Sequence, residues 1–442
     1  MRSTVPVARV LALSLLIVLQ ADRLHAQPAV VADEPDFLAA EPDLRAYVEE
    51  ALDRSPSVHE ALARYRAALR RVPQVTALPD PVVTFNHALR SVETRVGPQR
   101  NSFMISQAFP WFGTLDLQGQ MARQSATARY HLYTARQRDV IAEVKQAYYN
   151  LAYVDQAVRI SEEEQSLLEH YEALAETRYA TGQGLQQAVI KLQAEITKVM
   201  NRLEMLAQQR TTLAARLNTL RDRPPENALP SVAPLSLPEV TLDLAELYTL
   251  GDLNRDELQA ATALIEGAER SIERARKEYW PTFNVSAGFA NVGRRDDPAG
   301  QLLPPPDDGK NPFTVSIGLT LPLWTGKYRA GVQEAADELV ARRHSYTTVR
   351  NDMEFSVRDA VVRIQTLEAQ IDLFETALIP QAEAALRATE AAYETGQLGV
   401  LDLLDSERVL LDVRLIDARY SSDYLVALAQ LERAIGTSVP HQ

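Results

Sequence analysis

Two consecutive long stretches of the chain predict α-helices, and the second places its apolar residues three and four positions apart, which is the spacing of one helix face. The first stretch, 114–180, contains no proline and a single glycine. A continuous helix of that length would extend for roughly 100 Å, so no single globular core encloses it. In the next stretch, apolar residues alternate at spacings of four and three from Leu185 to Leu220, interrupted at Arg210. This pattern predicts a coiled-coil seam between two antiparallel helices.

Shorter stretches alternate apolar residues with small or polar ones at a period of two, which predicts β-strands. They lie at 82–90 and 101–109 in the first half of the chain, and at 283–290 and 313–321 in the second. A soluble sheet shows the same alternation, but these runs approach the ~9–11 residues with which a tilted strand crosses a bilayer. Four strands cannot close a membrane barrel, so we expect an oligomer that shares one.

The order of these patterns occurs twice. Each half predicts a helix, two strands, a long helix, a tight turn and a second long helix, and both turns carry Tyr-x-Thr-Gly-Gln, at 179–183 and 393–397. Such a recurrence indicates an internal duplication. In the second half, Pro380 is expected to bend the descending helix, and Ser406 and Asp417 interrupt the seam of the last one. We therefore predict a first repeat at 27–223, a proline-rich linker at 224–240, a second repeat at 241–436 and a tail at 437–442.

Residues 1–26 are typical of a cleaved secretion signal. Arg2 and Arg9 precede an apolar core at 10–19, and Leu-His-Ala at 24–26 offers a small-residue cleavage site. We expect the mature protein to leave the cytoplasm. No other stretch approaches the roughly 18 apolar residues of a transmembrane helix, so we expect any crossing of a bilayer to use β-strands.

The composition argues against several classes of function. With no cysteine, stability must come from packing or assembly, and the formal net charge of −13 argues against nucleic-acid binding. Seven histidines lie scattered, and no phosphate-binding loop, dinucleotide motif or nucleophile elbow is present. We expect no enzyme activity, no cofactor and no metal site. The acids Glu162, Glu163 and Glu164 are typical of a solvated helix face.

Two motifs mark the points where a strand leads into a long helix, Ala-Phe-Pro-Trp-Phe-Gly at 108–113 and Leu-Pro-Leu-Trp-Thr-Gly at 321–326. Together with the duplicated halves and the glycine turns, they resemble the TolC family of outer-membrane efflux ducts, over essentially the whole mature chain. The Phe-Pro-Trp form is similar to the heavy-metal (CzcC-like) branch. The membrane–periplasm junction residues that the resemblance implies are Pro110, Trp111, Pro322 and Trp324.

The resemblance implies a mainly α-helical fold with a small transmembrane β part, built from four strands and long coiled-coil hairpins. A homotrimer would form a twelve-stranded barrel in outer-membrane lipid, continuous with a periplasmic helical tunnel. The implied function is the exit duct of a tripartite efflux pump, with a periplasmic adaptor protein and an inner-membrane pump of the RND type as partners. The alternative is a periplasmic adaptor, which would carry one hairpin between glycine-rich halves. The adaptor-docking tips would contain Gly182, Gly184, Gly396 and Gly399.

Asp402 and Asp405 lie three positions apart, on one face at the start of the last long helix. In TolC-like ducts, two such aspartates form rings at the periplasmic gate, and rings of carboxylates favour cations. A simpler interpretation is a pair of exposed acids that the helix dipole favours. The equivalent residues of the first repeat are Ala188 and Lys191. Because Leu398 stands where some family members hold a gate-locking arginine, we expect packing rather than ion pairs to hold the gate.

Overall fold

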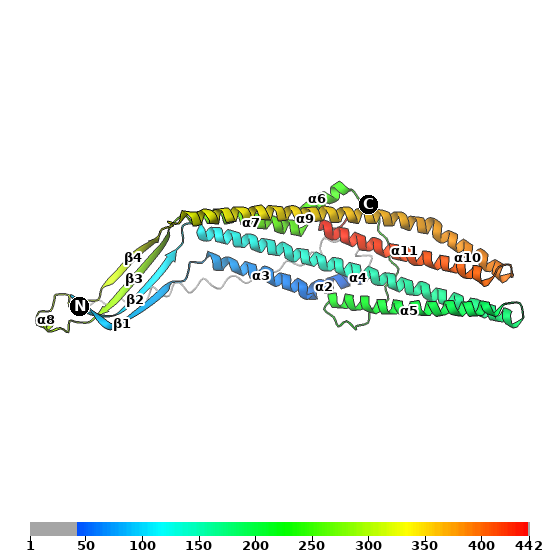
Figure 1. Ribbon diagram of the computed structural model, residues 1–442, viewed down its shortest axis with the longest axis horizontal. Helices are drawn as coiled ribbons and strands as arrows, with labels where there is room; N and C mark the ends of the chain where they lie inside the picture. The colour runs from blue at the N-terminus through cyan, green and yellow to red at the C-terminus, as the bar shows by residue number, and fades with distance from the viewer. Residues whose placement is uncertain (1–41, 441–442) are drawn as a thin grey trace.

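The computed structural model describes residues 42–440, so the signal segment, the start of the first repeat and the last two residues of the tail lie outside it. The molecule is elongated, with a β-sheet at one end and the turns of two helical hairpins at the other (Figure 1). The predicted fold class, mainly helical with a small sheet, is confirmed. The first half contains α2 (Pro42–Arg54), α3 (Pro56–Thr76), β1 (Val82–Thr94), β2 (Gly97–Phe109), α4 (Thr114–Ala180) and α5 (Gln186–Leu220). The second contains α6 (Leu244–Asn254), α7 (Asp256–Lys277), β3 (Thr282–Val292), α8 (Pro298–Leu302), β4 (Phe313–Thr320), α9 (Thr325–Leu373), the π-helical turn η3 (Phe374–Leu378), α10 (Ile379–Glu394) and α11 (Val400–Ile435).

Each half opens on two helices rather than the single helix that the sequence predicted. In the first half the break falls at Ser55, whose ψ of 122° is extended, and Pro56 follows as the first residue of α3. A proline cannot donate a helical hydrogen bond and restricts the residue before it, so the earlier helix ends there. The second half breaks at Arg255, with a ψ of 113° and no proline. The single helix predicted for each half was therefore wrong.

The sheet has the strand order β1-β2-β3-β4, and all neighbouring strands are antiparallel. Its register aligns Phe85, Phe103, Phe289 and Phe313 in one row across all four strands. Because side chains alternate between the two faces of a strand, this row lies on the same face as most of the other large apolar residues. The opposite face carries mainly small and polar residues, with Val82 and Met104 as exceptions. The strands of the first half are longer than predicted, since Gly97, with a φ of 118°, allows a tight hairpin.

The predicted seam of α5 is confirmed, and Arg210 has a structural role in it. The Arg210 guanidinium donates to Asp155 of α4 at 2.7 Å and to the carbonyl oxygens of Leu229 and Pro230 at 3.1 Å. The other oxygen of the buried Asp155 accepts the N–H of Val232 at 2.8 Å. These bonds tie the segment that joins the two halves onto the first hairpin. The residue that interrupts the heptad is therefore the one that holds this segment in place.

The bend predicted at Pro380 takes the form of the π-helical turn η3, which lies directly before it. A wider turn accommodates the loss of the helical hydrogen bond that the proline cannot donate. Asp417 of α11 lies near this turn, and its burial, together with the charge of Glu375, raises its pKa to about 6. Within residues 42–440, none of the helices combines the length and the apolarity that a membrane-spanning helix needs.

Candidate periplasmic gate and docking turns

The two glycine turns have the same backbone geometry. Gly182 and Gly396 have φ angles of 73° and 76°, in the left-handed region. In both turns the glycine N–H donates to the carbonyl three residues earlier, and the following glutamine N–H donates to the carbonyl five residues earlier. This is a common way to end a helix, and it favours glycine because a Cβ is strained there. Both turns lie at the end of the molecule opposite the sheet (Figure 1).

Gly184 and Gly399 differ from Gly182 and Gly396 in backbone geometry, because neither has a positive φ. A Cβ atom at Gly184 would approach the Cβ of Arg178 to 3.0 Å, so this position needs a small residue for close approach. Gly399 precedes α11 with a φ of −89°, and its N–H donates to Asp402 at 3.2 Å. The left-handed geometry thus belongs to one glycine in each turn.

The two candidate gate acids lie on an exposed face of α11. Asp402 and Asp405 line an open groove of about 520 Å³ between α5 and α11. Lys191, the first-repeat equivalent of Asp405, lines the same groove. Asp402 also accepts the N–H of Gly399, which is the role of an acid near a helix N-terminus. A cap for the helix and a contribution to a gate are compatible, because the capping bond uses only one carboxylate oxygen.

Polar contacts join the two hairpins near their turns. The Arg178 guanidinium donates to the carbonyl oxygen of Glu394 at 2.7 Å and lies 4.6 Å from the ring centroid of Tyr393. Further along, Arg408 of α11 pairs with Glu195 of α5, and the Tyr171 hydroxyl donates to Glu390. These contacts join the two hairpins of one chain, and the expectation that packing rather than ion pairs holds the gate stays a prediction. These pairs form between residues more than 200 positions apart, which sequence spacing does not reveal.

Two buried carboxyl groups lie between the hairpins. Glu164 of α4 accepts from Arg202 of α5 at 2.5 Å, and Glu407 of α11 is only 5% exposed. Burial raises the pKa of both groups, and the nearby charge of Glu164 helps to raise that of Glu407 to about 8. The prediction of a solvated acidic face fails for Glu164, while Glu162 and Glu163 are exposed. A signal for Glu407 was present, since it lies four residues after Leu403 and three before Leu410, on the seam.

The junction motifs differ in their surroundings. Trp111 stacks on Trp280 with ring centroids 4.7 Å apart, and it also stacks on Phe283 with ring centroids 5.7 Å apart. We call these three rings the junction platform. Phe283 belongs to the apolar face of β3, so the platform continues that face toward the helices. Pro110 and Pro322 follow β2 and β4, where the chain leaves the sheet, and Trp324 is 77% exposed at the start of α9.

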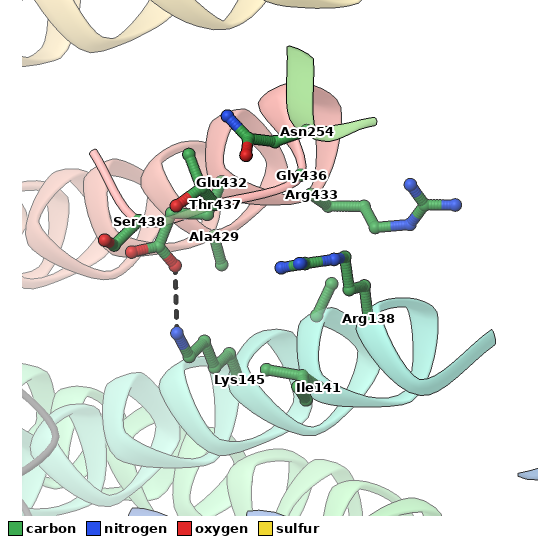
Figure 2. A pocket seen from close by; sticks show the side chains of 11 residues that line it. Arg138, Ile141, Lys145, Asn254, Ala429, Glu432, Arg433, Gly436, Thr437 and Ser438 are labelled. Atoms are coloured by element: carbon green, nitrogen blue, oxygen red, sulfur yellow. Dashed lines mark hydrogen bonds and ion pairs between the residues drawn. The ribbon is translucent and has the colours of Figure 1, made fainter. Parts of the chain in front are cut away.

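A small pocket of about 90 Å³ lies where α11 ends beside α4. Figure 2 shows the Lys145 ammonium group directed at the Glu432 carboxylate, at 2.9 Å. Arg138 and Arg433 also line it, and each pairs with an acid, Arg138 with Asp256 at 3.0 Å. The arrangement holds the middle of the helices together rather than presenting free charges. In the described part of the chain, no three metal-binding side chains gather into one group.

The chain resembles known outer-membrane proteins in both sequence and fold. The family model described as Outer membrane efflux protein matches residues 248–437. Outer membrane protein TolC of Vibrio cholerae is 24% identical, over 73% of this chain and 73% of that protein. Outer membrane protein OprJ of Pseudomonas aeruginosa is 26% identical, over 89% of this chain and 84% of that protein. The solved structure of the outer-membrane channel OprN shares the fold, with a TM-score of 0.75 and 19% identity over 93% of this chain and 95% of that chain.

The alternative of a periplasmic adaptor finds no support. The chain has two long hairpins and a four-stranded sheet, whereas an adaptor was expected to carry one hairpin. The matching proteins are outer-membrane proteins and an outer-membrane channel, and the matches extend over most of the chain. The family model, the relatives in sequence and the structural neighbours together support a TolC-family outer-membrane efflux protein.

Proposed function

We propose that three copies of this chain form one passive duct, without catalytic turnover, whose strands close a single sheet in outer-membrane lipid. The observation that carries this proposal is the four-stranded sheet with one apolar face and two open edges. In the described residues, β1 and β4 each pair with one strand only. An open edge is not tolerated in lipid, because its N–H and C=O groups lack partners there. Three chains of four strands supply a closed sheet of twelve.

The long helices would continue this sheet as a tunnel in the periplasm. The turns around Gly182 and Gly396 would dock the periplasmic adaptor and, through it, an inner-membrane pump of the RND type. Asp402 and Asp405 would form rings of carboxylates at the narrow end, where they favour cations. We propose that residues 27–223 and 241–436 act as two repeats joined by the segment 224–240, each supplying one hairpin. The choice of cargo would lie with the pump.

Cross-linking of the purified full chain in detergent is expected to stop at three copies. The reason is geometric, since the open edges of β1 and β4 leave no stable arrangement for one chain in a micelle. A lysine-reactive cross-linker followed by mass photometry measures the number of copies. A monodisperse monomer with its full β-content would contradict the trimer, and a chain that stays soluble without detergent would contradict the membrane sheet. ATP hydrolysis by the pure protein would contradict a passive duct.

Replacing Gly396 with valine is expected to abolish efflux while the trimer still inserts. A β-branched residue at a φ of 76° is strained by about 1–2 kcal/mol, and the change lies in the turn rather than in the sheet. The measurement is drug and metal susceptibility of a strain that depends on this duct. Gly331→Val is the matched control, because nothing lies within 4 Å of a Cβ at Gly331. Transport that survives valine at both Gly182 and Gly396 would show that the turns do not dock the adaptor.

A further inference from the structure

Two lysines lie beside the junction platform on neighbouring helices, Lys327 exposed and Lys277 half-buried. Lys277 ends α7, and one tight turn links it to the platform, since the Trp280 N–H donates to its carbonyl at 3.1 Å. Its Nζ lies 3.9 Å from the point that a Cβ atom of Gly113 would occupy, beside the start of α4. Lys327 lies in the first turn of α9, with its Nζ 5.5 Å from the ring centroid of Tyr328. Both ammonium groups therefore lie just beyond the end of the sheet.

The two helix ends that carry these lysines are in contact. The rings of Tyr279, after α7, and Tyr328, in α9, have centroids 5.6 Å apart. Figure 1 shows α7 and α9 running side by side to the point where the strands begin. The lysines thus belong to one surface region, next to the apolar face that the sheet presents.

The charges of this region have no acidic partners. Within residues 42–440, neither lysine forms an ion pair, and the adjacent Arg276 and Arg329 form none either. Arg274, in the same turn of α7 as Arg276, is by contrast paired with a glutamate at 3.0 Å. Most arginines of the hairpins are paired in this way. The unpaired cations at the junction are therefore available to an anion from outside the chain.

We propose that Lys277 and Lys327 bind the phosphate groups of anionic phospholipids in the leaflet that faces the helices. This inference rests on the proposed placement of the sheet in outer-membrane lipid. An apolar face gives the acyl chains a surface, exposed tryptophans mark the boundary with the headgroups, and long lysine side chains reach the phosphates from below. Trp280, which is 54% exposed, lies between the apolar face of the sheet and the lysine ammonium groups. A free phosphate ion would use the lysines but not the tryptophan or the sheet.

The test measures lipid binding to the detergent-purified full chain by native mass spectrometry. The probes are phosphatidylglycerol, phosphatidylcholine with the same acyl chains, and inorganic phosphate. The wild type is expected to retain phosphatidylglycerol more strongly, by roughly fivefold for each lysine near the headgroups. Lys277→Gln and Lys327→Gln should each remove part of this preference, and the double variant most of it. Arg358→Gln is the matched control, since it removes an exposed, unpaired cation from a distant part of α9.

Equal binding of the two lipids to the wild type would overturn the proposal, as would a double variant that keeps the preference. Inorganic phosphate that competes fully at millimolar concentration would identify a free-anion site instead of a lipid site. Failure of this inference is distinguishable from failure of the proposed function. A trimer that requires detergent but shows no lipid preference contradicts only the lysine site, whereas a monomer soluble without detergent contradicts the membrane sheet itself.

Discussion

Exchanging Asp402 and Asp405 together for asparagine is expected to remove most of the cation preference of the reconstituted channel. Three copies of each acid would converge at the narrow end of the tunnel, where negative rings attract cations and hold multivalent ones. Block by a multivalent cation added from the side of the turns should weaken by about tenfold or more, which corresponds to roughly 1.4 kcal/mol. Single-channel recording in planar bilayers measures both properties. Stability should change little, because both side chains are exposed.

The control is the double variant Asp337→Asn and Asp372→Asn, which removes two exposed acids from α9, away from the turns. It should leave selectivity and block unchanged. If the double variant of Asp402 and Asp405 behaves in the same way as this control, the two acids serve only the start of α11. High salt acts on a different contact. It screens the ion pair between Arg408 and Glu195, which joins the two hairpins near the groove.

We expect the wild type to lose stability as the pH rises, and we expect the Glu407→Gln variant to lose less. The pKa of Glu407 is raised from about 4.5 to about 8, so the folded chain holds a proton that the unfolded chain releases. Between these two values, stability falls as the pH rises, by up to about 1.4 kcal/mol for each pH unit and whole proton. Below pH 4.5 both states hold the proton, and above pH 8 neither does, so the slope vanishes at both ends.

The measurement is the thermal melting temperature of the purified protein in detergent at pH values from 5 to 8.5. The wild type should lose stability across this range, and Glu407→Gln should lose less, because glutamine keeps the shape of the protonated acid without ionising. Glu162→Gln is the matched control, since Glu162 is exposed on the face of α4 where Glu164 is buried. Parallel pH profiles for the wild type and Glu407→Gln would show that this carboxyl group is ionised in the folded chain.

The long elements of the fold could be predicted because nothing in their sequence interrupts them. Helix α4 spans Thr114–Ala180, as the absence of proline and the single glycine indicated. The sheet followed from alternation at a period of two. The short breaks were missed for different reasons. Pro56 carried a signal for the break before α3, but the corresponding break at Arg255 has no proline beside it to signal it.

The turns of the candidate site could also be predicted, because a left-handed residue favours glycine and Gly182 and Gly396 stand in the same motif. The contacts across the hairpins could not. Arg178 and Glu394 are 216 positions apart, so only the folded chain brings them together. Glu407 was predictable in principle from its place on the seam. Charged residues usually lie at the surface, so the sequence pattern alone did not lead us to expect a buried glutamate at this position.

The π-helical turn η3 sets a pivot partway along the second hairpin. Beyond it, α10 contains 16 residues, which makes a rigid arm of roughly 24 Å. A rotation of about 10° at the pivot would therefore carry the Gly396 turn through about 4 Å, at the rise per residue of an α-helix. The first hairpin has no such point, because α4 is continuous to its turn. Such a rotation would move the Gly396 turn without moving the Gly182 turn, so the two hairpin ends of one chain would respond differently to the same contact.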